Sequence, residues 1–162
     1  HIGVCNYSSG LLHDLMNYCE TKPEILQIES HPYLTQEKLI RLAKDYGLEV
    51  TAFSPLGSIS YEELGGAKES ESILKNKIVQ SISKDIGITP AQLILGWGLN
   101  RGTSIVVKST NEIRMKENLA ASSVKLEQSI IDKISALNVN KRYNDPGIFC
   151  EDAFNTFFPI YE

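Results

Sequence analysis

Four short runs of apolar and β-branched residues alternate along the chain with segments whose apolar positions recur at helical spacing. The runs cover residues 2–6, 24–30, 49–55 and 104–109, and their length and composition are typical of buried strands. Strands that alternate with helices are parallel and are joined by right-handed crossovers. The pattern therefore predicts an α/β protein built on a parallel sheet.

Residues that start and stop helices support the helical segments. Thr89, Pro90 and Gln92 form the signature of an N-cap, a first helical residue and a capping box. Thr35 is a second candidate N-cap, and Gly47 is placed to end the helix that Thr35 would open. The predicted helical segments are 10–19, 34–47, 72–86, 88–99, 112–120 and 128–137.

Two architectures accommodate four such strands in a single domain of 162 residues. One is a small open sheet of the flavodoxin type, and the other is half of an eight-stranded α/β barrel, whose usual size is about 250 residues. Residues 57–72 form the only long irregular stretch and predict either a surface loop or a flap over a ligand. The aromatic-rich tail, 138–162, is expected to pack over a core edge or a pocket mouth.

Composition and charge exclude several functional classes. The net charge of −4 gives no basic excess for nucleic acid or an anionic membrane, and no apolar run approaches the roughly 20 residues of a membrane helix. Three distant cysteines indicate free thiols in a reducing cytosol, and no spacing of His or Cys predicts a zinc site. Because His1 leads directly into an apolar run without a methionine, we expect the parent protein to start upstream.

A lysine closes the last predicted strand, and a helix follows it. Parallel strands bind ligands at their carboxyl ends, and a helix N-terminus directs free N–H groups and a positive dipole to the same point. The polar residues gathered there are Lys108, Ser109, Asn111 and Arg114. Together they predict a site for a phosphate dianion. Glu117 and Asn118, one turn further, suit the amino edge of an adenine.

Four blocks of sequence carry a family resemblance. They are "GVCNYS", "LQIESHPYLTQEKLIRLAKDYGLEVTAFSPLGS", "ITPAQLILGWGLNRGTSIVVKSTNEIRMKEN" and, more weakly, "NKRYNDP". In this order they resemble the C-terminal half of an aldo-keto reductase, one of the NADPH-dependent barrel enzymes that include aldose and xylose reductases. The resemblance extends to Pro146. It implies that the four runs are strands five to eight of a (β/α)8 TIM barrel.

The resemblance also implies an NADPH site, residue by residue. The nicotinamide end would involve Cys5, Asn6, Gln27 and Phe53, with Phe53 stacking on the ring. The pyrophosphate would lie along Ser54, Leu56 and Ser58, with residues 57–72 closing over it. The 2′-phosphate would be held by Lys108, Ser109, Thr110, Asn111 and Arg114, and the adenine by Glu117 and Asn118.

The chain departs from the family pattern at four of these positions or their neighbours. Cys5 stands in place of the usual serine, and a thiol is the weaker hydrogen-bond partner. Leu26 replaces an asparagine, Phe53 replaces a tyrosine but keeps the stacking face, and Val107 replaces a proline. The first two changes affect the nicotinamide end of the site.

The family's proton-transfer residues lie on the first four strands, so the resemblance places no catalytic residue in this chain. His31 is expected to be a hydrogen-bonded structural residue. Asn144, in "YNDP", would contact the substrate, and Phe149 with later aromatic residues would form an apolar wall.

The implied function of the parent protein is NADPH-dependent reduction of aldehydes, ketones or aldoses in the cytosol. Its partners would be a small carbonyl substrate and either the missing N-terminal half of the barrel or a second copy of the chain. Two alternatives stay open: a truncated form that binds NADPH or only self-associates, and a flavodoxin-like FMN binder. The latter lacks a phosphate-binding loop after its first strand, where "NYSSGLL" has only one glycine.

Overall fold

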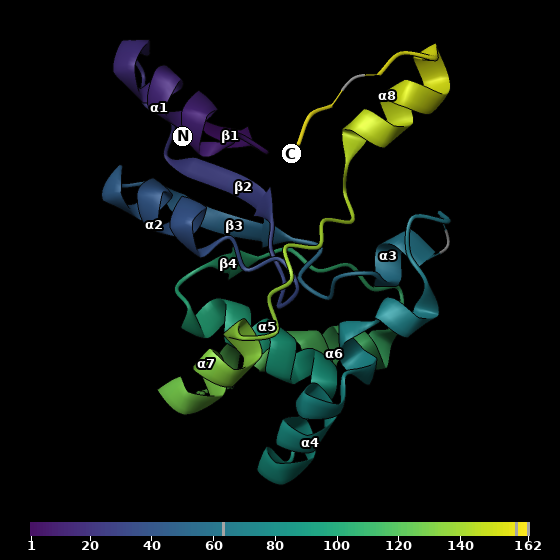
Figure 1. The fold of residues 1–162 in the computed structure, drawn as a ribbon. Helices are drawn as coiled ribbons and strands as arrows, with labels where there is room; N and C mark the ends of the chain where they lie inside the picture. Colours follow the sequence, from purple (N-terminus) through teal and green to yellow (C-terminus); the bar gives the residue numbers. More distant parts are fainter. Residues whose placement is uncertain (63, 158, 162) are drawn as a thin grey trace.

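The sheet contains four parallel strands that follow one another in space in the order of the chain. A computed structural model describes residues 1–62, 64–157 and 159–161 (Figure 1). The strands are β1 (Gly3–Cys5), β2 (Ile25–Glu29), β3 (Glu49–Phe53) and β4 (Ser104–Ile105), hydrogen-bonded in the order β1-β2-β3-β4. This order differs from the flavodoxin arrangement, in which the second strand lies outside the first, and it agrees with consecutive strands of a barrel.

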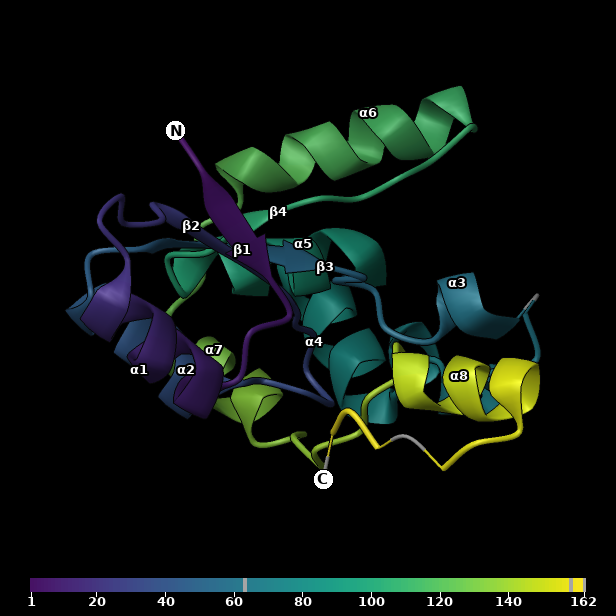
Figure 2. The same cartoon turned by 90° about the horizontal axis from the view of Figure 1, so that it is seen from above.

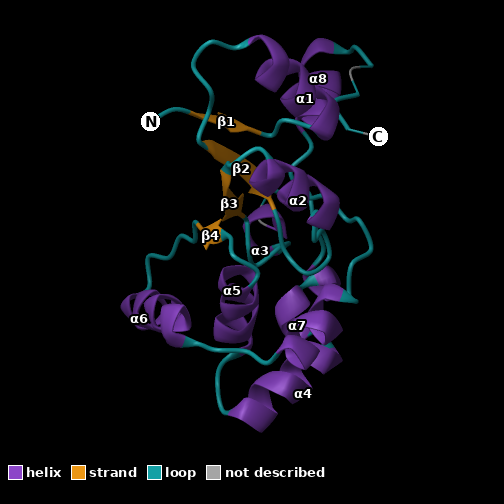
Figure 3. Cartoon of the chain, turned by 90° about the vertical axis from the view of Figure 1, so that its left-hand side faces the viewer, coloured by secondary structure: helices purple, strands orange, loops and turns teal. Residues whose placement is uncertain are grey.

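Helices follow each strand and pack mainly on one side of the sheet. They are α1 (Ser9–Tyr18), α2 (Glu37–Asp45), α3 (Ile59–Glu62), α4 (Lys77–Ile86), α5 (Pro90–Asn100), α6 (Glu112–Ala120), α7 (Gln128–Ser135) and α8 (Pro146–Phe154). Figure 3 shows α1 and α2 on the same side of the strands. The helices α3 and α8 lie beyond the carboxyl ends of the strands (Figures 1 and 2), so they are placed to shape a site there.

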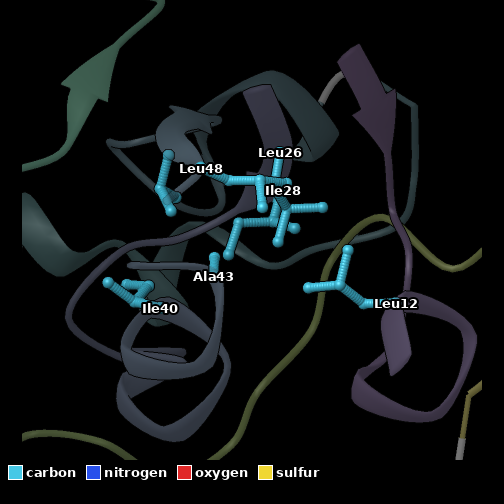
Figure 4. Close-up of a cluster of buried hydrophobic side chains, with 7 residues drawn as sticks. Leu12, Leu26, Ile28, Ile40, Ala43 and Leu48 are labelled. Atoms are coloured by element: carbon cyan, nitrogen blue, oxygen red, sulfur yellow. The ribbon is translucent and has the colours of Figure 1, made fainter. Parts of the chain in front are cut away.

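Alternating residues give the sheet one buried face and one open face. Leu26, Ile28, Val50 and Ala52 are buried. The first three belong to a core with Leu12, Ile40, Ala43 and Leu48, drawn in Figure 4. A second core surrounds Trp97, between α4, α5 and α7. On the opposite face Cys5 is exposed, and Gln27, Thr51 and Phe53 are only partly covered. Period-two alternation therefore leaves three of the predicted nicotinamide residues, Cys5, Gln27 and Phe53, on the open face.

Most of the predicted strand and helix positions are confirmed, and one capping residue was predicted wrongly. The capping box of α5 is present: the Thr89 hydroxyl accepts from the Gln92 N–H and the Gln92 side chain accepts from the Thr89 N–H. Gln36, not Thr35, is the N-cap of α2. The Thr35 N–H donates to the Asn138 side chain over 3.2 Å, a tertiary contact that no local motif predicts.

Three further segments differ from the sequence prediction. The strand predicted at 104–109 ends at Ile105, although the Val106 N–H still donates to the Ala52 carbonyl. The helix predicted at 72–86 is divided: a 3-10 turn (Ile73–Lys75) precedes α4, because the Asn76 side chain caps α4 by accepting from Ile78 N–H. The tail, predicted without a helix, contains α8.

Candidate functional site

A cavity of about 420 Å³ lies where the segment after β3 meets the N-termini of α5 and α6. Its polar lining consists of Thr89 and five polar residues that the sequence assigned to a nucleotide, Lys108, Ser109, Arg114, Glu117 and Asn118. Its apolar wall consists of Leu56, Ile59, Leu74, Pro90 and Ala91. Six residues that the sequence assigned to a nucleotide therefore line one space, namely the five polar residues and Leu56. This grouping brings a cationic end and an apolar wall into one cavity.

The N-terminus of α6 is shaped by two local hydrogen bonds. The Asn111 side chain accepts from the Arg114 N–H over 3.0 Å, and the Ser109 hydroxyl accepts from the Asn111 N–H over 3.1 Å. These bonds hold the turn after β4 in the geometry that turns Lys108 and Arg114 toward the cavity. Asn111 and its neighbour Thr110 do not line the cavity, so they are placed to shape the helix entrance.

The cavity is positively charged at this end. Lys108 and Arg114 are both exposed, and neither forms a salt bridge within the described ranges. Glu117 fixes the other end of the wall, because its backbone carbonyl accepts from the Gln92 side chain over 3.3 Å. Two cations beside a helix N-terminus can bind an anionic group.

The predicted nicotinamide residues lie apart from this cavity: Cys5 and Phe53 end β1 and β3, Asn6 follows β1, and Gln27 is the middle residue of β2. The Asn6 N–H donates to the Gln27 carbonyl over 2.8 Å, and the Cys5 Sγ lies 3.8 Å from the Gln27 Oε1. Phe53 is the last residue of β3 and is half-buried. Among the described residues the buried Oδ1 of Asn6 has no hydrogen-bond partner. The strands therefore place Cys5, Gln27 and Phe53 on the open side of the sheet, with Cys5 paired to Gln27, whereas the Asn6 side chain is partly buried.

Asn6 also lines a second cavity, of about 590 Å³, with the N-terminus of α2 and the side chains of Arg142 and Tyr161. The predicted pyrophosphate residues Leu56 and Ser58 do not share one cavity either. Leu56 lines the 420 Å³ cavity, whereas the fully buried Ser58 donates to the Glu62 side chain over 3.0 Å and does not face it.

A buried carboxylate that the sequence analysis missed anchors the C-terminal segment. Glu29, at the end of β2, is fully buried, and its side chain accepts from His31 Nε2 (2.9 Å), Tyr143 N–H (2.9 Å) and Asn144 N–H (3.0 Å). The Arg142 guanidinium lies 3.8 Å away. No local motif marks Glu29, because its two backbone donors come from the distant C-terminal part of the chain. His31 is also fully buried, as expected of a structural histidine.

The hydrogen bonds decide the ionisation of Glu29. Burial alone would raise the pKa of Glu29, but the hydrogen bonds from His31, Tyr143 and Asn144 outweigh it and lower the pKa below its ordinary value of 4.5. Glu29 is thus an anion in the folded protein.

The stability of the protein is expected to fall with pH below 4.5, partly through Glu29. The folded-state pKa is the lower one, so the unfolded chain binds the proton more readily. The stabilisation is complete above the ordinary pKa and is lost as the pH falls through the lower folded-state pKa. Urea unfolding followed by circular dichroism over this range measures the slope. Glu29→Gln should show a shallower slope, and equal slopes would contradict the assignment.

Some of the other residues in the C-terminal tail are held by contacts with the rest of the chain, and others are exposed. The Asn144 backbone is held by Glu29, and the Arg142 guanidinium lies 3.7 Å from the Tyr161 ring centre. Phe154 and Phe157 are 74% and 81% exposed and line neither cavity, so they do not form the expected apolar wall. The Phe149 side chain and Phe158 lie outside the described residues. In the described ranges, no helix has the length and apolarity to cross a membrane.

Comparison with known proteins identifies relatives across the whole chain. Probable NAD(P)H-dependent D-xylose reductases of Aspergillus terreus and Aspergillus oryzae are 44% and 40% identical over 162 residues, which is 99% of this chain and 49% of each relative. The NAD(P)H-dependent D-xylose reductase of Aspergillus niger is 42% identical over 147 residues, or 90% of this chain and 46% of that protein. The chain spans about half the length of these curated relatives.

The profile of the aldo/keto reductase family matches residues 1–139. The family implies a (β/α)8 barrel, and the observed α/β arrangement with a parallel sheet in chain order agrees with part of one. The chain belongs to the aldo/keto reductase family.

Proposed function

We propose that the protein containing this chain reduces aldoses and related aldehydes or ketones with NADPH, and that this chain supplies the cofactor-binding half. The observation that carries the proposal is the cavity in which Lys108, Ser109 and Arg114 meet at the N-terminus of α6. NADPH differs from NADH by a 2′-phosphate, which is a dianion. Two cations and a helix N-terminus bind such a group better than they bind a ribose hydroxyl.

The remainder of the cavity suits the adenosine of the same nucleotide. Leu56, Leu74 and Pro90 offer an apolar surface for a purine, and Glu117 with Asn118 offers acceptors and donors at its edge. Bound NADPH would supply the hydride. The residues of this chain would bind and orient the nucleotide. Phe53, Gln27 and Cys5, on the open face of the sheet, and Asn6, directly after β1, would contact the nicotinamide.

The order of the elements supports the assignment of β1–β4 as strands five to eight. Barrel enzymes commonly bind phosphate with the loops after strands seven and eight. Here the anion-binding turn follows β4, the last strand of the chain. The open sheet face and the free edges of β1 and β4 would then meet strands one to four, which carry the proton-transfer residues in the family. Cytosolic residence is part of the same proposal.

The first experiment titrates the intact protein with NADPH and, separately, with NADH, then adds D-xylose and follows the absorbance of the reduced nucleotide. We expect tighter binding of NADPH and its oxidation when D-xylose is added. Equal affinity for both nucleotides would contradict the 2′-phosphate site. Absence of binding would contradict the function as a whole.

A second candidate is a form that binds NADPH or pairs with another copy without turnover. The feature that favours it is the open sheet face bounded by two edge strands, β1 and β4, because unpaired edges favour association. Tight NADPH binding without oxidation by any aldehyde, together with a dimeric mass in native mass spectrometry, would support this form over the reductase.

A further inference from the structure

Tyr143 contacts the segment that forms the Leu56, Ile59 and Leu74 wall of the cavity beside α6. It is only 6% exposed, and its ring stacks on Tyr61 with centroids 5.9 Å apart and planes 18° apart. Its hydroxyl donates to the Glu71 carbonyl over 3.3 Å. A Cβ built on Gly57 would lie 3.6 Å from the Tyr143 ring. One side chain from the C-terminal segment thus touches this wall segment at three described positions.

These contact points alternate with the residues that line the cavity. Leu56 and Ile59 line it beside Gly57 and Tyr61, and Leu74 lines it shortly after Glu71. Tyr143 therefore contacts the same chain segments that carry the lining residues of the wall. Aromatic stacking of this kind adds stability beyond the area it buries.

Tyr61 extends the support to Ser54, the first residue after β3. The Tyr61 hydroxyl and the Ser54 hydroxyl are 2.9 Å apart and share a hydrogen bond. Ser54 has a φ of 47°, a left-handed conformation that a serine keeps only when its surroundings hold it there. Burial raises the pKa of Tyr61 and raises that of Tyr143 to about 12. Both hydroxyls therefore remain protonated at neutral pH and can donate.

Tyr143 is itself held in place by the buried carboxylate of β2. Its N–H donates to Glu29, which is fully buried. The support therefore runs from β2 through Tyr143 and Tyr61 to the residue that follows β3.

We propose that Tyr143 is a positioning residue of the nucleotide site, acting through Tyr61 on Ser54 and on the cavity wall. The inference rests on the proposed function and on the pyrophosphate contact that the family resemblance implies for Ser54. Because NADPH and NADH share the pyrophosphate and the adenine, loss of this support weakens the binding of both nucleotides equally. Loss of a 2′-phosphate contact would instead affect NADPH alone.

The test measures the dissociation rates of NADPH and NADH by stopped-flow fluorescence in the intact protein. Tyr143→Leu removes the stacked ring, Tyr61→Phe removes only the hydroxyl on Ser54, and Tyr143→Phe restores the ring. The first two variants should release both nucleotides about three- to tenfold faster, whereas Tyr143→Phe should recover most of the slow release. Tyr18→Leu is the matched control, because Tyr18 is 68% exposed on α1.

Two results would overturn the inference. One is unchanged release of both nucleotides from Tyr61→Phe and Tyr143→Leu; the other is a loss confined to NADPH. Tyr61→Phe keeps the test decisive if Tyr143→Leu does not fold. Failure of the wild-type protein to bind either nucleotide would overturn the proposed function itself. If the wild-type protein binds both nucleotides and the variants release them at the wild-type rate, only the role of Tyr143 is overturned.

Discussion

Replacing Arg114 by methionine is expected to weaken NADPH binding roughly 30- to 100-fold while changing NADH binding by less than about threefold. Arg114 lines the cavity beside Lys108 and Ser109, and its guanidinium has no salt-bridge partner among the described residues. It is therefore free to form charge-assisted hydrogen bonds with a 2′-phosphate. Isothermal titration calorimetry with each nucleotide measures both affinities.

Lys116→Met is the matched control for this prediction. Lys116 is on the same helix, α6, but pairs with Glu112 on the surface and does not line the cavity. It removes the same charge from the same helix, so NADPH affinity should change by less than about threefold, as expected for a distant, solvent-screened charge. If the two variants weaken NADPH binding equally, Arg114 acts through the net charge of the protein and not through a contact with the phosphate.

Glu29→Gln is expected to lower the free energy of unfolding by about 3 kcal/mol at neutral pH. The carboxylate accepts from His31, Tyr143 and Asn144 and faces Arg142. An amide has one acceptor oxygen, so at least one of these buried donors loses its partner, and Arg142 loses its counter-charge. Urea unfolding at equilibrium measures the loss.

Glu112→Gln serves as the comparison, because Glu112 belongs to an exposed pair with Lys116. Its effect should stay within about 0.5 kcal/mol. Glu29→Gln should also speed amide hydrogen exchange at Tyr143 and Asn144, the two residues whose N–H groups it holds. Wild-type stability and exchange in Glu29→Gln would show that the carboxylate does not anchor the C-terminal segment.

Features set by neighbours in sequence were predictable, and those set by distant residues were not. The capping box at Thr89 and Gln92 depends on two residues within one helical turn. Likewise, Lys108, Ser109, Arg114, Glu117 and Asn118 share a cavity because one turn and one helix carry them all. Their spacing alone was therefore sufficient to place them together.

Distant contacts account for what the sequence did not show. Thr35 is a residue type that favours the N-cap, but α2 begins one residue later with Gln36 at the N-cap, and the Thr35 N–H donates to the distant Asn138. The role of Glu29 depends on Tyr143 and Asn144, which approach it only after the chain has folded. The same holds for the predicted cofactor residues that lie outside the 420 Å³ cavity, such as Asn6 and Ser58. Periodicity assigns a residue to a face of the sheet but does not identify its neighbours.

The strand order has a consequence for how the chain folds. Gly3 pairs with Ile25 and Ile25 pairs with Glu49, so each of these pairings closes a loop that carries a single helix. Strands β1, β2 and β3 can therefore assemble one after another as the polypeptide leaves the ribosome. Thr51 pairs with Ser104 across a longer segment that carries α3, α4 and α5, and long loops close more slowly. Docking of β4 is expected to be the late kinetic step, so the turn after it, which carries Lys108 and Ser109, would be the last part of the cavity to form.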